Sequence, residues 1–203
     1  MSSTAASPRT RKRPEERRAE LEQAARAIAL EQGLAAVTLR AVAARAGVAS
    51  GLVAHYAPSM DDLVAQTFAA IVGAELADIR ALLADVPEPG ARMSLLLDTL
   101  LDGTRDDVTL VWVQAWALGR GSDALAAEVR RQMDAWQQAI EQIVVDGAAA
   151  GVFHDVDAGE AAALAWQILA MVDGLNAHSL VRWSGVGDRR DLTRRAIAAL
   201  LGG

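Results

Sequence analysis

The chain has 203 residues, of which 52% are hydrophobic and 23% are charged, a composition typical of folded proteins and unlike that of disordered ones. It has no cysteine, which excludes disulfides, thiolate zinc sites and cysteine nucleophiles. No apolar run approaches the roughly 20 residues that span a bilayer, and no apolar segment of a secretory signal follows the basic N-terminus. We therefore expect a soluble, cytoplasmic protein.

The net charge of −6 is divided unevenly along the chain. Residues 1–60 hold nine Lys or Arg against five Glu, whereas residues 61–203 hold eleven Arg against 21 Asp or Glu. A basic N-terminal third is typical of a polyanion-binding module, although a solvated basic arm gives the same count. The charge split by itself leaves both interpretations open.

The first half of the chain has the composition and spacing of short helices. Alanine occupies 44 positions, and Phe and Tyr together occupy only three, which favours helices over strands. Residues 1–13 show no apolar periodicity, and we predict a flexible basic arm there. Helical spacing then predicts helices from 14 to about 33, over 39–46, from 49 or 50 to 56, and from 59 to about 84.

The second half contains no proline beyond position 89, so glycine-rich and aspartate-rich breaks separate its predicted helices. We expect these helices at about 91–102, 108–118, 123–150, 158–183 and 189–201. The fold class that follows is all-α with about nine helices. A small N-terminal three-helix unit precedes a larger helical bundle.

Residues 38–56 have the pattern of two short helices joined by a tight turn. Apolar residues recur at helical spacing on both sides of Gly47, which is suited to end the first helix. Small residues around the turn allow the two helices to cross closely, as in a helix-turn-helix motif. Short side chains such as Ala49 and Ser50 on the second helix would let it approach the major groove of DNA. An ordinary helical hairpin gives a similar pattern.

The helix-turn-helix pattern is part of a longer set of motifs, which covers about fifty residues from Arg17 to Phe68. The motifs are Glu31-Gln32-Gly33-Leu34, Val37-Thr38-Leu39-Arg40, Val42-Ala43, Ala46-Gly47-Val48, Gly51, His55-Tyr56 and Ser59-Met60-Asp61-Asp62-Leu63. In these residues the chain resembles the DNA-binding domain of the TetR family of bacterial transcriptional regulators, and its BetI-like branch most of all. Met60 departs from the family pattern, which often has a lysine at this position that touches a phosphate.

The resemblance implies two domains and a DNA partner. Residues 14–70 would form the helix-turn-helix DNA-binding domain, and residues 71–203 a ligand-sensing and dimerisation domain. A dimer would bind double-stranded operator DNA, with phosphate contacts setting its position and base contacts its sequence preference. The residues expected to contact DNA are Thr38, Arg40, Arg45, Ala49, Ser50, Gly51, Val53, His55 and Tyr56.

All five tryptophans lie beyond position 110, in the predicted larger bundle. Trp112 and Trp116 are four residues apart and share a helix face. Such a cluster can line a ligand cavity or fill the core of a bundle, and the sequence leaves both open. The resemblance implies a small-molecule effector site here, and the aromatic faces suit an apolar or cationic ligand. The expected ligand-binding residues are Trp112, Trp116, Met133, Trp136, Trp166 and Asn176, with Gln114, Gln137, Gln167, Asp173 and His178 as further possible polar partners.

The last two predicted helices carry apolar stripes that the resemblance assigns to a homodimer interface. The expected interface residues are Leu164, Ile168, Met171, Asp173, Leu175, Leu192, Ala196 and Leu200. An interface and an internal core have the same periodicity, so the stripes alone do not separate them.

The functional interpretation is a ligand-responsive transcriptional regulator, most simply a homodimeric repressor that a small molecule releases from a near-palindromic operator. We expect no enzyme activity, because the three histidines are scattered and no serine or glycine-rich loop has a catalytic setting. We likewise expect no cofactor, metal or membrane partner. The alternative is a helical protein-interaction or ligand-binding module that no longer binds DNA.

Overall fold

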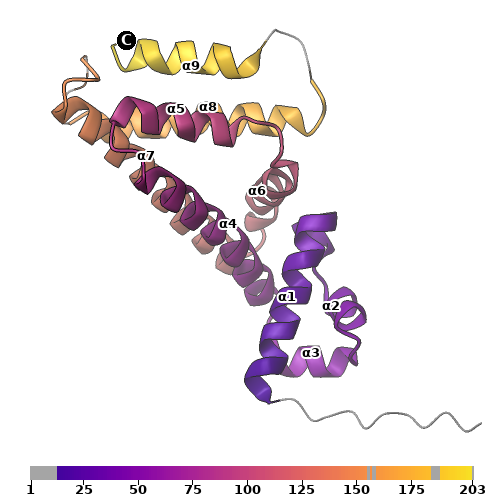
Figure 1. Cartoon of the computed structure of the whole chain (residues 1–203). Coiled ribbons are helices and arrows are strands. Elements are labelled where there is room, and N and C mark those ends of the chain that lie inside the picture. The colour runs from indigo at the N-terminus through magenta and orange to yellow at the C-terminus, as the bar shows by residue number, and fades with distance from the viewer. Residues whose placement is uncertain (1–12, 155, 157–158, 184–187, 203) are drawn as a thin grey trace, which may run out of the picture.

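The computed structural model describes residues 13–154, 156, 159–183 and 188–202. All regular structure within these residues is helical (Figure 1), and none of these helices has the length and apolar character of a membrane span. The elements are α1 (Pro14–Gln32), the 3₁₀-helix η1 (Leu34–Ala36), α2 (Leu39–Ala46), α3 (Ser50–Tyr56), α4 (Met60–Ala84), α5 (Pro89–Leu100), α6 (Asp106–Gly119), α7 (Asp123–Ala149), α8 (Ala161–Ser179) and α9 (Arg189–Leu200). The prediction of an all-α fold with about nine helices is confirmed for the described part of the chain.

Two elements differ from the sequence-based expectation. The short η1 was not predicted; it follows Gly33, whose φ of 88° turns the chain at the end of α1. Helix α8 is shorter than the predicted 158–183, because the backbone turns after His178 and Arg182 takes a left-handed φ of 54°. The predicted basic arm lies outside the described residues except for Arg13.

The first three α-helices form a small unit whose local sequence explains its turns. The Thr38 hydroxyl caps α2 by accepting a hydrogen bond from the backbone N–H of Ala41 (3.2 Å). Gly47 ends α2 with a φ of 64°, a left-handed conformation that glycine adopts without strain. Val42 and Val53 are completely buried in the core that these helices share. The unit therefore has a defined inner face and a defined outer face.

Helix α4 connects this unit to the larger bundle. It begins where the Ser59 hydroxyl accepts a hydrogen bond from the N–H of Asp62 (3.1 Å), and it runs away from α1 toward the opposite end of the molecule (Figure 1). There α4 packs along α7, which also contacts α5, α6 and α8. The C-terminal helix α9 packs against α8 and α5.

Helix α6 is a second connection between the two parts. It packs against α4, α7 and α8 on one side and against α1 and η1 on the other. The Oε1 atom of Gln114 accepts a hydrogen bond from the backbone N–H of Ala35 in η1 (2.8 Å). The same amide group lies so close to Gly33 that a Cβ at that residue would be 2.5 Å from Nε2. A displacement of α6 would therefore move Gly33 and Ala35 in the three-helix unit, because Gln114 contacts both.

Candidate functional site

Most residues predicted to contact DNA lie together on one surface formed by α2, α3 and the turn between them. Gly51 lies in the first turn of α3, and no other part of the described chain comes within 4 Å of the place a Cβ would occupy. The first turn of α3 thus presents backbone and short side chains outward. The exposed members of the predicted set are Thr38, Arg40, Arg45, Ala49, Ser50, Gly51 and His55.

The prediction that Val53 contacts DNA is wrong. Its side chain is 0% exposed and belongs to the core of the three-helix unit. Val53 is three positions after the exposed Ser50, and the helix places it on the inner side, whereas the adjacent Ala54 is exposed. Val53 holds α3 in place and does not belong to its outer face.

Arg45 is exposed but already has an acidic partner. Its Nη1 and Nη2 atoms donate hydrogen bonds of 2.6 and 2.5 Å to the carboxylate of Glu31 on α1. This bidentate hydrogen bonding lowers the pKa of Glu31. A phosphate would compete with Glu31 for the guanidinium, so Arg45 offers less to an anionic partner than its charge alone suggests.

His55 and Tyr56 close the C-terminal end of α3. Their rings meet edge to face with centroids 5.2 Å apart. His55 is exposed, whereas Tyr56 is half-buried and packs against the hydrophobic core. The pair therefore combines an outward imidazole with a tyrosine whose ring is held by the core.

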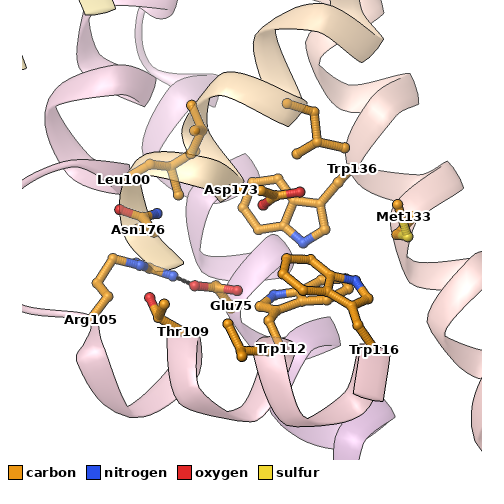
Figure 2. Close-up of a pocket in the computed structure, with 13 residues that line it drawn as sticks. Glu75, Leu100, Arg105, Thr109, Trp112, Trp116, Met133, Trp136, Asp173 and Asn176 are labelled. Atoms are coloured by element: carbon orange, nitrogen blue, oxygen red, sulfur yellow. Dashed lines mark ion pairs between the residues drawn. The ribbon is translucent and has the colours of Figure 1, made fainter. Parts of the chain in front are cut away.

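The larger bundle contains a pocket bounded mainly by α4, α6, α7 and α8 (Figure 2). It encloses about 550 Å³ of empty space, including its opening to solvent. One face of α6 contributes Thr109, Trp112, Val113 and Trp116, at the spacing of successive helical turns. The other lining residues are Glu75, Leu100, Arg105, Met133, Trp136, Leu169, Val172, Asp173 and Asn176.

Three of the predicted tryptophans line this pocket together. The rings of Trp112 and Trp116 have centroids 5.8 Å apart, and Trp112 also meets Phe68 of α4 edge-on at 5.0 Å. The Nε1 groups of Trp116 and Trp136 are buried and have no hydrogen-bond acceptor in the described part of the chain. A buried donor without an acceptor costs about 1–3 kcal/mol, so both favour a ligand that carries an acceptor atom.

Trp166, which was predicted to join this cluster, lies outside the pocket with 58% of its surface exposed. It lies on the flank of α8, away from the buried face that Ala165, Ile168 and Val172 form. The prediction is wrong because the position of Trp166 in the middle of a helix does not say which side of that helix faces the pocket. Gln114 is likewise turned toward η1 and does not line the pocket.

The pocket also holds three ionisable side chains. The carboxylate of Glu75 forms an ion pair with the guanidinium of Arg105, and these side chains are 8% and 21% exposed. Burial raises the pKa of Asp173 to about 6. Burial lowers the pKa of Arg105, an effect that the nearby Asp107 opposes. Asp173, for which the sequence left a ligand contact and an interface hydrogen bond open, lines the pocket.

Sequence reasoning did not find Glu75 or Arg105. A signal for Glu75 exists, because this acid is three or four residues from Ile71, Val72 and Ile79, which form the buried face of α4. No comparable signal marks Arg105, which immediately precedes α6. Within the described residues no group of three or more His, Asp or Glu is arranged to hold a metal ion.

The predicted interface residues fall into two groups. Ile168 is 0% exposed inside the bundle, so it cannot contact a partner and that prediction is wrong. Trp183 and Val181, which follow α8, are 57% and 75% exposed and add to the apolar surface there. The predicted residues that remain half-buried or exposed are Leu164, Met171, Asp173, Leu175, Leu192, Ala196 and Leu200.

A helix-turn-helix unit followed by a helical bundle with an internal pocket defines a class of DNA-binding regulators. Residues 22–67 match the family model described as "Bacterial regulatory proteins, tetR family". Residues 89–202 match the one described as "BetI-type transcriptional repressor, C-terminal". The chain therefore belongs to the TetR family of transcriptional regulators, with a BetI-type C-terminal domain.

Solved structures share this fold across almost the whole chain. One is a transcriptional regulator from Saccharomonospora viridis in complex with choline, which has 23% identity, covers 93% of this chain and 96% of its own, and gives a TM-score of 0.77. A TetR regulator from Haloarcula marismortui has 21% identity, coverages of 93% and 97%, and a TM-score of 0.75. RolR in complex with resorcinol has 16% identity, coverages of 93% and 88%, and a TM-score of 0.63. No curated protein sequence matches the chain significantly.

Proposed function

We propose that this protein is a homodimeric repressor that binds operator DNA in the cytoplasm and is released when a small molecule occupies the tryptophan pocket. One observation carries the proposal. Helix α6 lines the pocket with Trp112 and Trp116, and the same helix is hydrogen-bonded to the three-helix unit through Gln114. Occupancy of the pocket and the position of the unit are thereby linked.

The outer face of α2 and α3 is the proposed DNA-binding surface. Thr38, His55 and Tyr56 are proposed to contact phosphates through their hydroxyl and imidazole groups, and Arg40 is an exposed cation on the same unit. Ala49 and Ser50 are short and exposed at the start of α3, so they allow that helix to lie deep in a major groove. Arg45 would contact DNA when a phosphate replaces Glu31 as the partner of its guanidinium.

The exposed apolar residues of α8 and α9 support dimerisation through this end of the bundle. Leu192 is 38% exposed, and the half-buried Met171 and Leu164 lie on the neighbouring helix. Burying such side chains against a second copy is favourable, by about 25 cal/mol for each Å² of apolar surface. In the dimer, the two α3 helices would lie about 34–36 Å apart, matching successive major grooves.

The effector is proposed to be apolar or cationic. The structural neighbours bind unlike molecules, choline in one case and resorcinol in another, so their likeness does not choose between these classes. A ligand shifts an equilibrium only by binding one conformation more tightly than the other. A coupling of about 1–3 kcal/mol would change DNA affinity 5- to 150-fold.

The test is a footprint and a mobility-shift titration with the DNA that flanks the gene. Tyr56→Phe and Thr38→Ala should each weaken binding to all sequences, by about fivefold for a hydrogen bond of about 1 kcal/mol. Ser50→Ala should change sequence preference instead. Thr99→Ala removes the same kind of hydroxyl from α5, far from the proposed surface, and should leave DNA affinity unchanged.

Two outcomes would overturn the proposal. A protein without a footprint and without salt-dependent DNA affinity would be a helical module that does not bind DNA. Light scattering that gives 21.4 kDa at micromolar concentration would exclude the dimer. The pocket is tested separately: if Trp116→Ala changes neither effector affinity nor DNA release, the effector binds elsewhere.

A further inference from the structure

A second hollow of the larger bundle is a groove between α4, α5 and α7, which we call the α4–α5–α7 groove. It has about 900 Å³ of empty space, including its opening to solvent, a size typical of small-molecule sites. Among the described residues only Trp136 lines both this groove and the tryptophan pocket. Figure 2 shows the Nε1 group of Trp136 directed toward Trp116, on the side of the tryptophan pocket. The groove is therefore a separate site.

The apolar part of the groove is mainly aliphatic. Side chains from all three helices form it, and all of them are buried in the core of the bundle: Ile79, Leu83, Leu96, Ile140 and Ile143. A ligand that covers these side chains loses apolar surface to a preformed apolar lining, which is favourable. A linear alkyl chain is the simplest group that fits such a lining.

The charged side chains that line the groove are both positive. They are Arg80 of α4 and Arg92 of α5, and none of the lining residues is Asp or Glu. The exposed Arg80 donates a hydrogen bond from Nη2 to the carbonyl oxygen of Ala135 (3.3 Å), and it has no carboxylate partner among the described residues. The tryptophan pocket has the opposite balance, because two carboxylates line it and one guanidinium. The groove therefore favours an anion.

Arg92 has hydrogen-bonding capacity that the described chain does not use. Its Nη1 atom donates to Oδ2 of Asp146 (2.8 Å), and the other carboxylate oxygen of Asp146 accepts from Gln142. The Nε group of Arg92 is buried and has no acceptor among the described residues. Nε and Nη2 form the edge of the guanidinium that Asp146 leaves free, and such an edge donates two parallel hydrogen bonds to one carboxylate. Arg92 is thus equipped to bind a second carboxylate.

The two guanidinium groups are held at opposite ends of the groove. Arg80 contacts α7 at Ala135, and Arg92 contacts it at Asp146, eleven residues later. At about 1.5 Å per residue, this separation along the helix is about 16 Å. A hydrogen bond of about 3 Å at each end leaves about 10 Å for a ligand. An extended dicarboxylate with the chain length of suberate matches this space.

We propose that the α4–α5–α7 groove binds a free linear dicarboxylate with one carboxylate at each end of the chain. One carboxylate pairs with the free edge of Arg92, and the other pairs with the exposed Arg80. The alkyl chain between them lies along the buried aliphatic side chains. This site is additional to the proposed effector pocket, and it does not depend on DNA binding.

The experiment measures the binding of suberate by isothermal titration calorimetry. Octanoate has the same chain length with a single carboxylate, and succinate has two carboxylates on a chain too short to reach both arginines. A peptide of alternating Glu and Leu residues tests whether the groove takes an acidic protein segment instead.

The variants are chosen to separate the two ends of the groove. Arg80→Gln and Arg92→Gln each remove one guanidinium, and Arg130→Gln removes an exposed arginine of α7 that does not line the groove. Ala84→Phe adds a large side chain at an exposed lining position of α4, and Ala81→Phe adds it at an exposed position of the same helix outside the lining. Circular dichroism melts confirm that each variant is folded.

A site with two ends predicts a specific pattern of affinities. Wild type should bind suberate about fivefold more tightly than octanoate, the upper range for one exposed ion pair, and succinate more weakly than suberate. Arg80→Gln should abolish the preference for suberate over octanoate. Arg92→Gln should weaken suberate binding about tenfold, because it removes charge-assisted hydrogen bonds. Ala84→Phe should weaken both ligands, whereas Ala81→Phe and Arg130→Gln should bind them like wild type.

Four results would overturn the proposal. Equal affinities of wild type for suberate and octanoate, or a preference that Arg80→Gln leaves unchanged, would exclude a site with two ends. Absence of suberate binding would exclude the dicarboxylate, also where the acidic peptide binds. Suberate binding that Trp116→Ala weakens and Ala84→Phe does not would place the ligand in the tryptophan pocket. None of these results bears on the proposed DNA-binding function, which the footprint of the wild-type protein tests without any ligand.

Discussion

The three-helix unit carries its candidate functional groups on the outside, whereas the larger bundle carries them inside. Thr38, Ser50 and His55 are exposed, and each shares its local region with a separate buried residue such as Val53. In the bundle, Trp136 and Glu75 belong to the pocket and to the packed interior at once. Apart from Thr38, which also caps α2, and Tyr56, whose ring packs on the core, the candidate recognition residues and the core residues are different side chains in the first region, whereas in the second they are the same side chains.

This difference has electrostatic consequences. Exposed groups on the α2–α3 face remain solvated, and their partners are replaceable, as the surface pair of Arg45 with Glu31 illustrates. Inside the bundle, burial raises the pKa of Asp173 to about 6 and makes Glu75 dependent on Arg105. A change of charge inside the pocket would therefore also change the stability of the bundle.

The largest expected effect tests whether α3 has a buried face that stabilises the fold and an exposed face that does not. Val53→Ala should lower the free energy of unfolding by about 2–3 kcal/mol, because it removes two methyl groups from a completely buried side chain and leaves a cavity. Ser50→Ala, three residues away and exposed, should change unfolding by less than about 0.5 kcal/mol. Urea titration followed by circular dichroism measures both values.

DNA affinity should show the reverse order for the same two variants. Val53→Ala should bind DNA like wild type once the folded fraction is accounted for, whereas Ser50→Ala should show altered discrimination between sequences. Equal stability losses in the two variants would contradict the division of α3 into an inner and an outer face.

The organisation of the unit could be predicted from the sequence because local chemistry fixes it. Gly47 at the turn and Thr38 as a cap specify the bounds of α2, which agree with the structure. The error at Val53 arose because a seven-residue helix offers too few turns to define its buried face from spacing alone. The pairing of Arg45 with Glu31 could not be predicted either, because Glu31 is on another helix.

The bundle could be predicted only as a set of helices. Trp112, Trp116 and Trp136 line one pocket as predicted, yet Trp166, which was grouped with them, is exposed to solvent. Ile168 belongs to the core, although it lies in the stripe assigned to an interface, and Asp173 in the same stripe lines the pocket. Periodicity identifies a buried face, but which helix covers that face depends on tertiary packing.

The next effect in size concerns Asp173 and the pH dependence of stability. Its pKa of about 6 lies above the ordinary value of 3.8, so the folded protein binds this proton more tightly than the unfolded chain. The stabilisation is complete below about pH 4 and is lost as the pH rises through 6. Between pH 5 and 7.5, the wild type should therefore lose about 1–1.5 kcal/mol relative to Asp173→Asn.

Chemical denaturation at several pH values measures this difference, with Asp78→Asn as a control that removes an exposed carboxylate from α4. A wild type that gains stability relative to Asp173→Asn over the same interval would show that this carboxyl group is not desolvated. The pocket would then resemble the solvated surface of the three-helix unit, and the contrast between the two regions would fail.

The smallest expected effect is at the contact where the two regions meet. Gln114→Ala removes the acceptor for the N–H of Ala35, a neutral hydrogen bond worth about 1 kcal/mol. Hydrogen exchange of residues 34–37 should therefore be about fivefold faster in the variant, while exchange in α7 and α8 stays unchanged. Gln114→Glu retains an acceptor oxygen at this position and should preserve much of the protection. Unchanged exchange in Gln114→Ala would mean that η1 is held by its own core residues, such as Leu34, and that α6 reaches the DNA-binding unit only through α1 and α4.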